Sequence, residues 1–377
     1  MMKYLLSSLL LLILLGCENK KVATDNGGIS LSKAMGDIET EEFTKAVEKR
    51  NFVFPDDHGA HPDFRTEWWY FTGNLISDEG KEFGYQFTIF RTALTKSKPE
   101  RISEWSTNQI YMAHFAVTDI DGNKFYFDEK FSREGNYLAG AQTNPLKVWL
   151  EDWQIIQVDD RTTLGLPVIR IKAKTDKVEI NFILEAAKPF VLQGDSGLSQ
   201  KGAQVGNASY YYSYTRIKTS GKIILNEKDY EVSGFSWMDR EWSTSALSEG
   251  QAGWDWFALQ LEDNTELMYY QMRKNDGSPD IFSKGVLVDE NGSSQLIKKE
   301  DVILKVTNNW KSPNGMAFPS GWTLQIPGKN IYLIITPAIK NQFLDVSVKY
   351  WEGSVKIEGL KNGNRVNGRG YVELTSY

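Results

Sequence analysis

Short strand-like segments make up most of the sequence, and they constrain its fold more than any other feature. Runs rich in aromatic and β-branched residues recur from residue 68 to residue 375, separated by turn signals such as Asp121-Gly122. Helical periodicity is scarce, with residues 38–50 as the best helix candidate. About eighteen short strands with regular turns predict an all-β protein built as sandwiches or barrels.

The length of the strand-rich region indicates two domains, because it exceeds one usual hydrophobic core. The two halves also resemble each other. Residues 68–71 (WWYF) precede an acidic turn and a strand that ends in Arg91, and residues 254–257 (WDWF) precede an acidic turn and a strand that ends in Arg273. This faint repeat supports two related barrels. We place the N-terminal barrel at 41–230 and the C-terminal barrel at 231–377.

The first seventeen residues have the layout of a secretory signal, in which one lysine precedes a short apolar run. Residues 14–17 (LLGC) resemble the lipobox of bacterial lipoproteins, in which the cysteine is acylated. Ordinary cleavage beside an incidental cysteine is the alternative. We therefore predict a signal peptide at 1–17, lipidation of Cys17 and a polar tether at 18–40. Glu18 in place of Asp favours the outer membrane, so we expect an envelope lipoprotein that faces the periplasm.

Composition excludes several function classes. Cys17 is the single cysteine of the chain, so its acylation leaves no thiol for a disulfide, a cysteine-ligated metal or a nucleophile. A net charge of −6 without a basic stripe argues against nucleic acid as a partner. No phosphate-binding or dinucleotide motif stands beside a strand–helix unit, and no Gly-x-Ser-x-Gly motif is present, so we predict no cofactor and no serine-hydrolase elbow.

Residues 61–73 (HPDFRTEWWYFTG) combine aromatic side chains, which are usually buried, with charged side chains. Burying Glu67 and Arg65 there costs several kcal/mol unless they pair or form hydrogen bonds. Glu67 is either one member of a structural ion pair or a carboxyl whose pKa rises so that it donates a proton. Strand alternation places Glu67 and Trp69 on one face and Trp68 and Tyr70 on the other, and only one face can line a cavity.

A second cluster spans residues 236–243 (SWMDREWS), followed by GWDWF at 253–257. Carboxylic acids beside aromatic rings can protonate an alkene and stabilise the resulting cation. The same residue types also describe a barrel strand whose tryptophan closes the barrel bottom. Tyr210-Tyr211-Tyr212 predicts a strand with rings on both faces, one of which lines the cavity.

The three histidines, His58, His61 and His114, are considered as metal ligands together with Asp57. Their spacing matches no metal signature, and Pro62 disfavours a helical histidine pair. We therefore expect no metal, and we expect these imidazoles to form hydrogen bonds with carboxylates that hold a loop.

Three separated motifs carry a resemblance to a known family. Residues 54–75, residues 234–244 with GWDWF, and residues 368–377 (GRGYVELTSY) resemble the AttH-like branch of the carotenoid hydratase (CrtC-like) family. The resemblance covers about residues 52–377 and implies two tandem lipocalin-like antiparallel β-barrels. Carotenoid hydratases protonate a polyene and add water, and AttH-like members are often labelled secreted hydrolases. Arg240 stands where the hydratase branch has histidine, and arginine is a poor proton donor at neutral pH.

Three functions follow as hypotheses, and an envelope scaffold without a ligand has the least support in the sequence. The first is a lipid-anchored protein that binds a lipid, terpenoid or polyketide in an aromatic-lined cavity and serves an ABC-type transport system. The second is a hydratase, cyclase, isomerase or hydrolase that acts on an unsaturated apolar substrate by carboxylic-acid catalysis. The candidate catalytic residues are Glu67, Asp239, Arg240, Glu241 and Asp255. The candidate ligand-binding residues are Trp68, Trp69, Tyr70, His114, Tyr211, Trp242, Trp254 and Trp256.

Overall fold

The computed structural model describes residues 42–97, 100, 103–245 and 247–377. Within these ranges the chain consists of β-strands with four short 3₁₀ turns: η1 (Asp56–His58), η2 (Gly135–Tyr137), η3 (Lys299–Asp301) and η4 (Pro327–Lys329). The described segments contain no helix of the length and apolarity that a bilayer crossing requires. Cys17, the signal segment and the tether predicted at 18–40 lie outside the described residues.

The first barrel is a 13-stranded antiparallel sheet. Its main path runs β4-β3-β2-β1-β13-β12-β9-β8-β7-β6-β5, with β10 and β11 added on β12. The sheet curls until β3 and β4 lie close to β5 and β6, which nearly closes the barrel. Its strands are β1 (Thr66–Ser77), β2 (Glu82–Ala93), β3 (Gln109–Asp119), β4 (Lys124–Arg133), β5 (Ala139–Gln142), β6 (Lys147–Leu150), β7 (Trp153–Thr163), β8 (Leu166–Lys174), β9 (Val178–Ala186), β10 (Val191–Leu192), β11 (Leu198–Gln200), β12 (Ala208–Leu225) and β13 (Lys228–Ser243).

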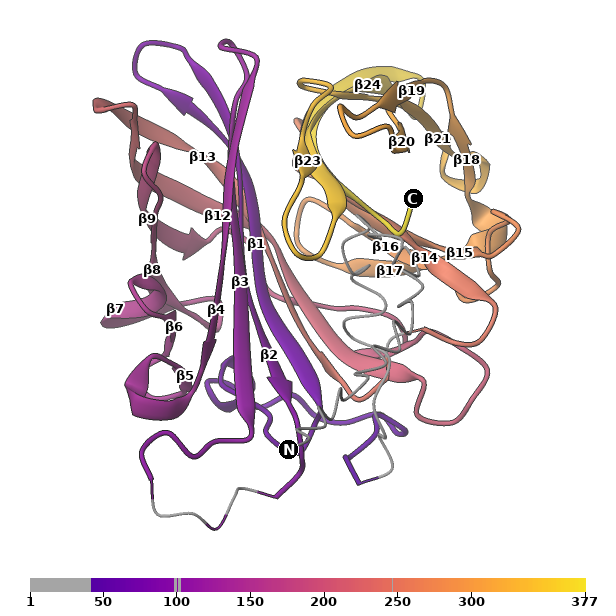
Figure 1. Cartoon of the computed structure of the whole chain (residues 1–377). Helices are drawn as coiled ribbons and strands as arrows, with labels where there is room; N and C mark the ends of the chain where they lie inside the picture. Colours follow the sequence, from indigo (N-terminus) through magenta and orange to yellow (C-terminus); the bar gives the residue numbers. More distant parts are fainter. Residues whose placement is uncertain (1–41, 98–99, 101–102, 246) are drawn as a thin grey trace, which may run out of the picture.

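The second barrel is a 10-stranded antiparallel sheet whose path runs β17-β16-β15-β14-β25-β24-β22-β21-β18, with β23 paired to β24. Figure 1 shows it curving beside the long strands of the first sheet. Its strands are β14 (Gln251–Leu261), β15 (Glu266–Lys274), β16 (Lys284–Val288), β17 (Ser294–Lys298), β18 (Ile303–Val306), β21 (Trp322–Ile326), β22 (Ile331–Pro337), β23 (Phe343–Leu344), β24 (Tyr350–Lys361) and β25 (Asn364–Thr375). A separate hairpin joins β19 (Asn309–Lys311) to β20 (Ala317–Pro319). The fold class predicted from the sequence, two tandem lipocalin-like antiparallel barrels, is confirmed.

Two details differ from the sequence-based expectations. β13 pairs with β1 and β12, so the first sheet continues to Ser243 and the second begins at Gln251, whereas we placed the division at residue 230. Residues 42–50 of the expected helix are not helical; residues 38–41 lie outside the described part. Phe43 and Ala46 are buried, and the Thr44 amide donates to the Asp63 carbonyl, so tertiary packing overrides the local helical pattern.

Three buried regions result from strand alternation, because successive side chains of a strand point to opposite faces. Trp69 and Phe71 of β1 belong to the hydrophobic core of the first barrel, whereas Tyr70 and Trp68 pack toward the second sheet. In the same way Phe257 of β14 belongs to the second barrel core and Trp256 packs toward the first sheet. The seam between the two barrels is therefore a third buried layer, and it is rich in tyrosine and tryptophan.

Candidate active site

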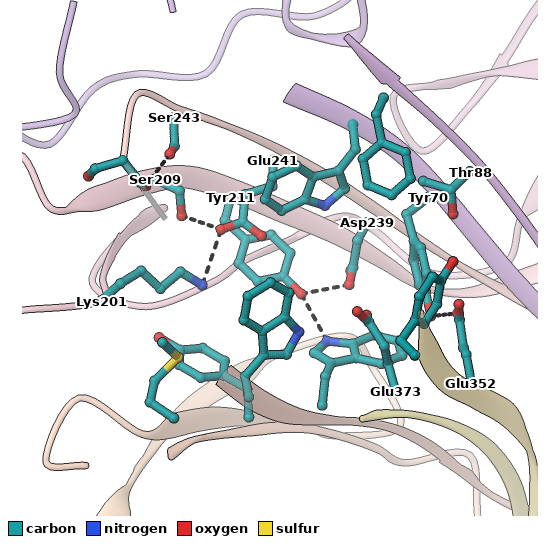
Figure 2. A pocket seen from close by; sticks show the side chains of 18 residues that line it. Tyr70, Thr88, Lys201, Ser209, Tyr211, Asp239, Glu241, Ser243, Glu352 and Glu373 are labelled. Carbon is teal, nitrogen blue, oxygen red and sulfur yellow. Dashed lines mark hydrogen bonds and ion pairs between the residues drawn. The ribbon is translucent and has the colours of Figure 1, made fainter. Parts of the chain in front are cut away.

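A pocket lies in the seam between the barrels and encloses about 840 Å³ of atom-free space, part of which opens to solvent. Strands of both sheets form its wall, so the pocket exists only because the two barrels pack together. Figure 2 shows its lining side chains converging from the two sheets. They are Trp68, Tyr70, Thr88, Phe90, Lys201, Ser209, Tyr211, Asp239, Glu241, Ser243, Ser245, Trp254, Trp256, Tyr270, Met272, Tyr350, Glu352 and Glu373.

Asp239 of β13 is fixed in the pocket by three donors. Its carboxyl accepts hydrogen bonds from Tyr211 Oη at 2.6 Å, Trp237 Nε1 at 2.7 Å and Ser213 Oγ. Burial raises the pKa of Asp239 to about 7, although these three hydrogen bonds act in the opposite direction. Asp239 can therefore gain or lose a proton near neutral pH.

Two further carboxyls, Glu352 of β24 and Glu373 of β25, are directly opposite each other in the strand register. Glu352 accepts a hydrogen bond from the Tyr70 hydroxyl (Figure 2). Its Oε2 has no hydrogen-bond partner among the residues that the structure describes. Burial raises the pKa of Glu373, and the nearby carboxyls of Asp239 and Glu241 raise it further. Burial and the carboxyl of Glu373 raise the pKa of Glu352 well above its usual value. Carboxylic acids held in the protonated form can donate a proton at neutral pH.

The fourth carboxyl, Glu241, is paired with a cation. It accepts a hydrogen bond from Ser209 Oγ and lies 3.1 Å from Lys201 Nζ. Lys201 Nζ also lies 4.2 Å from the centroid of the Tyr270 ring, within cation–π range. The pocket therefore carries an ion pair at Glu241 and two further carboxyls, Glu352 and Glu373, which Figure 2 shows on the side of the second sheet.

The structure brings seven of the sequence-predicted site residues together in the pocket. They are the carboxyls Asp239 and Glu241 and the aromatic residues Trp68, Tyr70, Tyr211, Trp254 and Trp256. His114 does not line the pocket, but its Nδ1 lies 2.7 Å from the hydroxyl of Tyr350, which does.

Glu67, Trp69, Arg240 and Trp242 lie on the other face of their strands, inside the first barrel. Glu67 pairs with Arg91 and Arg240, and His61 Nδ1 lies 3.2 Å from its carboxyl. The Arg240 guanidinium lies 4.0 Å from the Trp69 ring centroid, and His61 stacks on Trp242 at 3.7 Å. Residues of odd number in β1 and even number in β13 share this interior face, so this ion-pair network cannot reach a ligand in the seam.

Asp255 also lies outside the pocket, inside the second barrel. Its carboxyl accepts hydrogen bonds from Arg273 Nε and Tyr377 Oη, each at 2.8 Å. Asp255–Arg273 is thus the counterpart of Glu67–Arg91 in the first barrel, and both arginines are those that the sequence repeat singled out. The repeat marks a buried carboxylate–arginine pair inside each barrel rather than a functional site.

Sequence reasoning missed Glu352, Glu373, Lys201, Tyr270 and Tyr350. Glu373 stands between Val372 and Leu374, and Glu352 follows Trp351, so each is a carboxylate beside large apolar residues of a strand. The same signal singled out Glu67. Applied to the C-terminal strands, it would have identified both glutamates.

The chain matches the AttH-like family over residues 45–377 and belongs to it. It is similar to the crystal structure of an AttH candidate from Nitrosomonas europaea, with 34% sequence identity and a TM-score of 0.78, covering 89% of this chain and 100% of that one. This membership confirms the resemblance found in the sequence.

Two kievitone hydratases are also similar to this chain. The enzyme of Fusarium solani subsp. phaseoli is 20% identical over 251 residues, which is 65% of this chain and 69% of that protein. The crystal structure of the Nectria haematococca enzyme has a TM-score of 0.65 and 14% identity, covering 89% of this chain and 98% of that one, and it shares the fold.

Proposed function

We propose that this protein is a hydratase that binds an unsaturated apolar molecule in the seam pocket and adds water across a double bond. The observation that carries the proposal is the set of buried carboxyls with raised pKa values among aromatic rings. Similarity to a kievitone hydratase supports the class of reaction. Arginine at position 240 is a poor proton donor, but this does not count against a hydratase. Residue 240 faces the interior of the first barrel and is not required as a proton donor.

The roles follow from the surroundings of each carboxyl. Glu373 donates its proton to one alkene carbon, which leaves a carbocation at the other carbon and a carboxylate at Glu373. The rings of Trp254, Trp256 and Tyr211 stabilise the cation. Water attacks the cation and gives a proton to the carboxylate of Asp239. That proton then returns to Glu373, so the net change is the addition of one water molecule.

The experiment that tests this function is incubation of the purified protein with an apolar cell extract in ¹⁸O-labelled water. Mass spectrometry is expected to show a component that gains one labelled water with wild type, and far less of this product with Asp239→Asn or Glu373→Gln. Glu358→Gln, an exposed position on β24, is the matched control and should behave as wild type. Identical product profiles for wild type and both pocket variants would exclude the hydratase.

A second function, binding of an apolar ligand without chemistry, is favoured by one observation. Tyr211, Ser213 and Trp237 saturate the Asp239 carboxyl, as in a structural carboxylate. A binding protein would carry a co-purifying apolar ligand that Trp256→Ala releases, with no labelled product. The partner would then be the ligand itself and a transport system that receives it.

We also propose that Cys17 carries acyl chains that hold the protein at the envelope, on the periplasmic face of the outer membrane. The support is the lipobox-like sequence LLGC at 14–17. Metabolic labelling with an alkyne fatty acid is expected to mark wild type and to leave Cys17→Ser unmarked. Labelling of Cys17→Ser equal to that of wild type would rule out this anchor.

A further inference from the structure

His114 of β3 is a fully buried imidazole that the proposed reaction does not use. It lies directly behind the pocket wall, where its Nδ1 is 2.7 Å from the Tyr350 hydroxyl. Tyr350 and Glu352 lie two residues apart on the same face of β24, and both side chains line the pocket. One side of His114 is therefore connected to a pocket carboxylic acid.

The other side of His114 points toward the surface of the protein. Its Nε2 lies 3.9 Å from Glu129 Oε2 of β4, and neither atom has a hydrogen-bond partner among the described residues. Ser347 fixes the Glu129 carboxyl, because its amide and its hydroxyl both donate to Oε1 at 2.9 Å. This leaves Oε2 facing the imidazole, and a movement of about 1 Å completes the hydrogen bond. The Glu129 side chain is 23% exposed and so borders solvent, although Oε2 itself is buried.

The surroundings of His114 are apolar. Phe90 meets the imidazole edge-on at 5.5 Å, and Phe90 packs with Leu344, Val348 and Tyr350 in one buried cluster. Burial lowers the pKa of His114 to about 3, so the ring stays neutral. A neutral, buried imidazole can pass a proton by accepting it on one nitrogen and releasing it from the other.

We propose that Glu129, His114 and Tyr350 form a proton relay between solvent and Glu352. In the resting state Glu352 holds its proton, Tyr350 donates to His114 Nδ1, and His114 carries its proton on Nε2. When a proton leaves Nε2 through Glu129, the Tyr350 proton moves to Nδ1 and the Glu352 proton moves to Tyr350. Glu352 ends as a carboxylate and His114 ends as the other neutral tautomer. The reverse sequence recharges Glu352 from solvent.

This relay rests on the proposed function in one respect, since it supplies protons to Glu352 and Glu373, the pair of carboxylic acids used in the hydration step. Glu373 faces Glu352 across the two strands, so a proton delivered to Glu352 is available to the carboxyl that donates to the alkene. A substrate that fills the pocket excludes water, and the relay then connects the acid pair to solvent. His114 and Tyr350 are positioning and proton-transfer residues here.

The test is a measurement of the His114 tautomer, and it needs no substrate. The whole chain is labelled with ¹⁵N-histidine, and proton–nitrogen spectra of the rings are recorded as the pH is raised through the ionisation of Glu352. The titratable groups that face Glu352 are Glu373, Tyr70, Tyr350 and Tyr371. His114 is expected to carry its proton on Nε2 at neutral pH and on Nδ1 once Glu352 has ionised. In Glu352→Gln it should keep the proton on Nε2 at every pH.

His58 provides an internal control within the same spectrum. Its Nδ1 also lies 2.7 Å from a tyrosine hydroxyl, that of Tyr212, but its Nε2 lies 2.9 Å from the Gly165 carbonyl. It should keep one tautomer throughout, and its unchanged signals would show that each variant is folded. A single His114 tautomer in wild type over the whole range, or an imidazolium ion, would overturn the relay. Absence of labelled product in the water-addition assay would overturn the hydratase and leave the relay intact.

Discussion

Replacing Glu373 by glutamine is expected to lower the turnover number of the hydration by roughly 10²–10⁴-fold, the usual contribution of a positioned general acid. Glutamine has nearly the same shape, but its amide is not acidic enough to protonate an alkene. Binding should remain within a few-fold of wild type, because Trp68, Trp254 and Trp256 still form the aromatic wall. Steady-state kinetics and tryptophan fluorescence titration measure the two quantities separately.

The pH dependence of the rate tests whether Asp239 is the base that works together with Glu373. The working form requires an ionised Asp239 and a protonated Glu373. The rate should therefore rise as the pH passes about 7, the raised pKa of Asp239, and fall at higher pH as Glu373 loses its proton. Asp239→Asn should remove the rising part of the profile. A rate that Glu373→Gln leaves unchanged would show that another group donates the proton.

The strands and the paired barrels could be predicted from sequence because both depend on local pattern. Turn residues separate the strands, and alternation of large apolar side chains marks each one. Which side chains face the seam between the two barrels could not be predicted in the same way. Trp68 and Trp69 have the same type and neighbours, yet Trp68 lines the pocket and Trp69 fills the first barrel. Alternation separates two faces but does not say which of them meets the second barrel.

The same limit explains the mixed outcome for the charged residues. Asp239, Arg240 and Glu241 are consecutive, so alternation sends Arg240 to the barrel interior and the two carboxyls to the pocket. Glu352 and Glu373 complete the site from strands more than 100 positions away along the chain. Their proximity depends on how the second barrel packs against the first, which no local pattern encodes.

Glu67→Gln is expected to destabilise the protein by about 3–5 kcal/mol, the usual cost of removing one partner from a buried ion pair. The change leaves the guanidinium groups of Arg91 and Arg240 buried without their counter-ion. Arg91 would keep its bonds to Gln109 and to the carbonyls of His61 and Phe64, so the loss concerns charge more than hydrogen bonding. Urea denaturation measures the difference in the free energy of unfolding.

A matched control is Glu82→Gln on β2, where Glu82 also pairs with two cations, Lys356 and Arg369, but at a partly exposed position. Partly exposed pairs contribute about 0–1 kcal/mol, so this variant should stay close to wild type. Although burial alone would raise the pKa of Glu67, Arg91 and Arg240 hold it well below 4.5. The stabilisation from Glu67 is therefore complete above its unfolded pKa and is lost as the pH falls toward its folded pKa. Wild type should lose stability on acidification below about pH 4 more steeply than Glu67→Gln. Equal losses for Glu67→Gln and Glu82→Gln would show that the network inside the first barrel contributes no more than a surface ion pair.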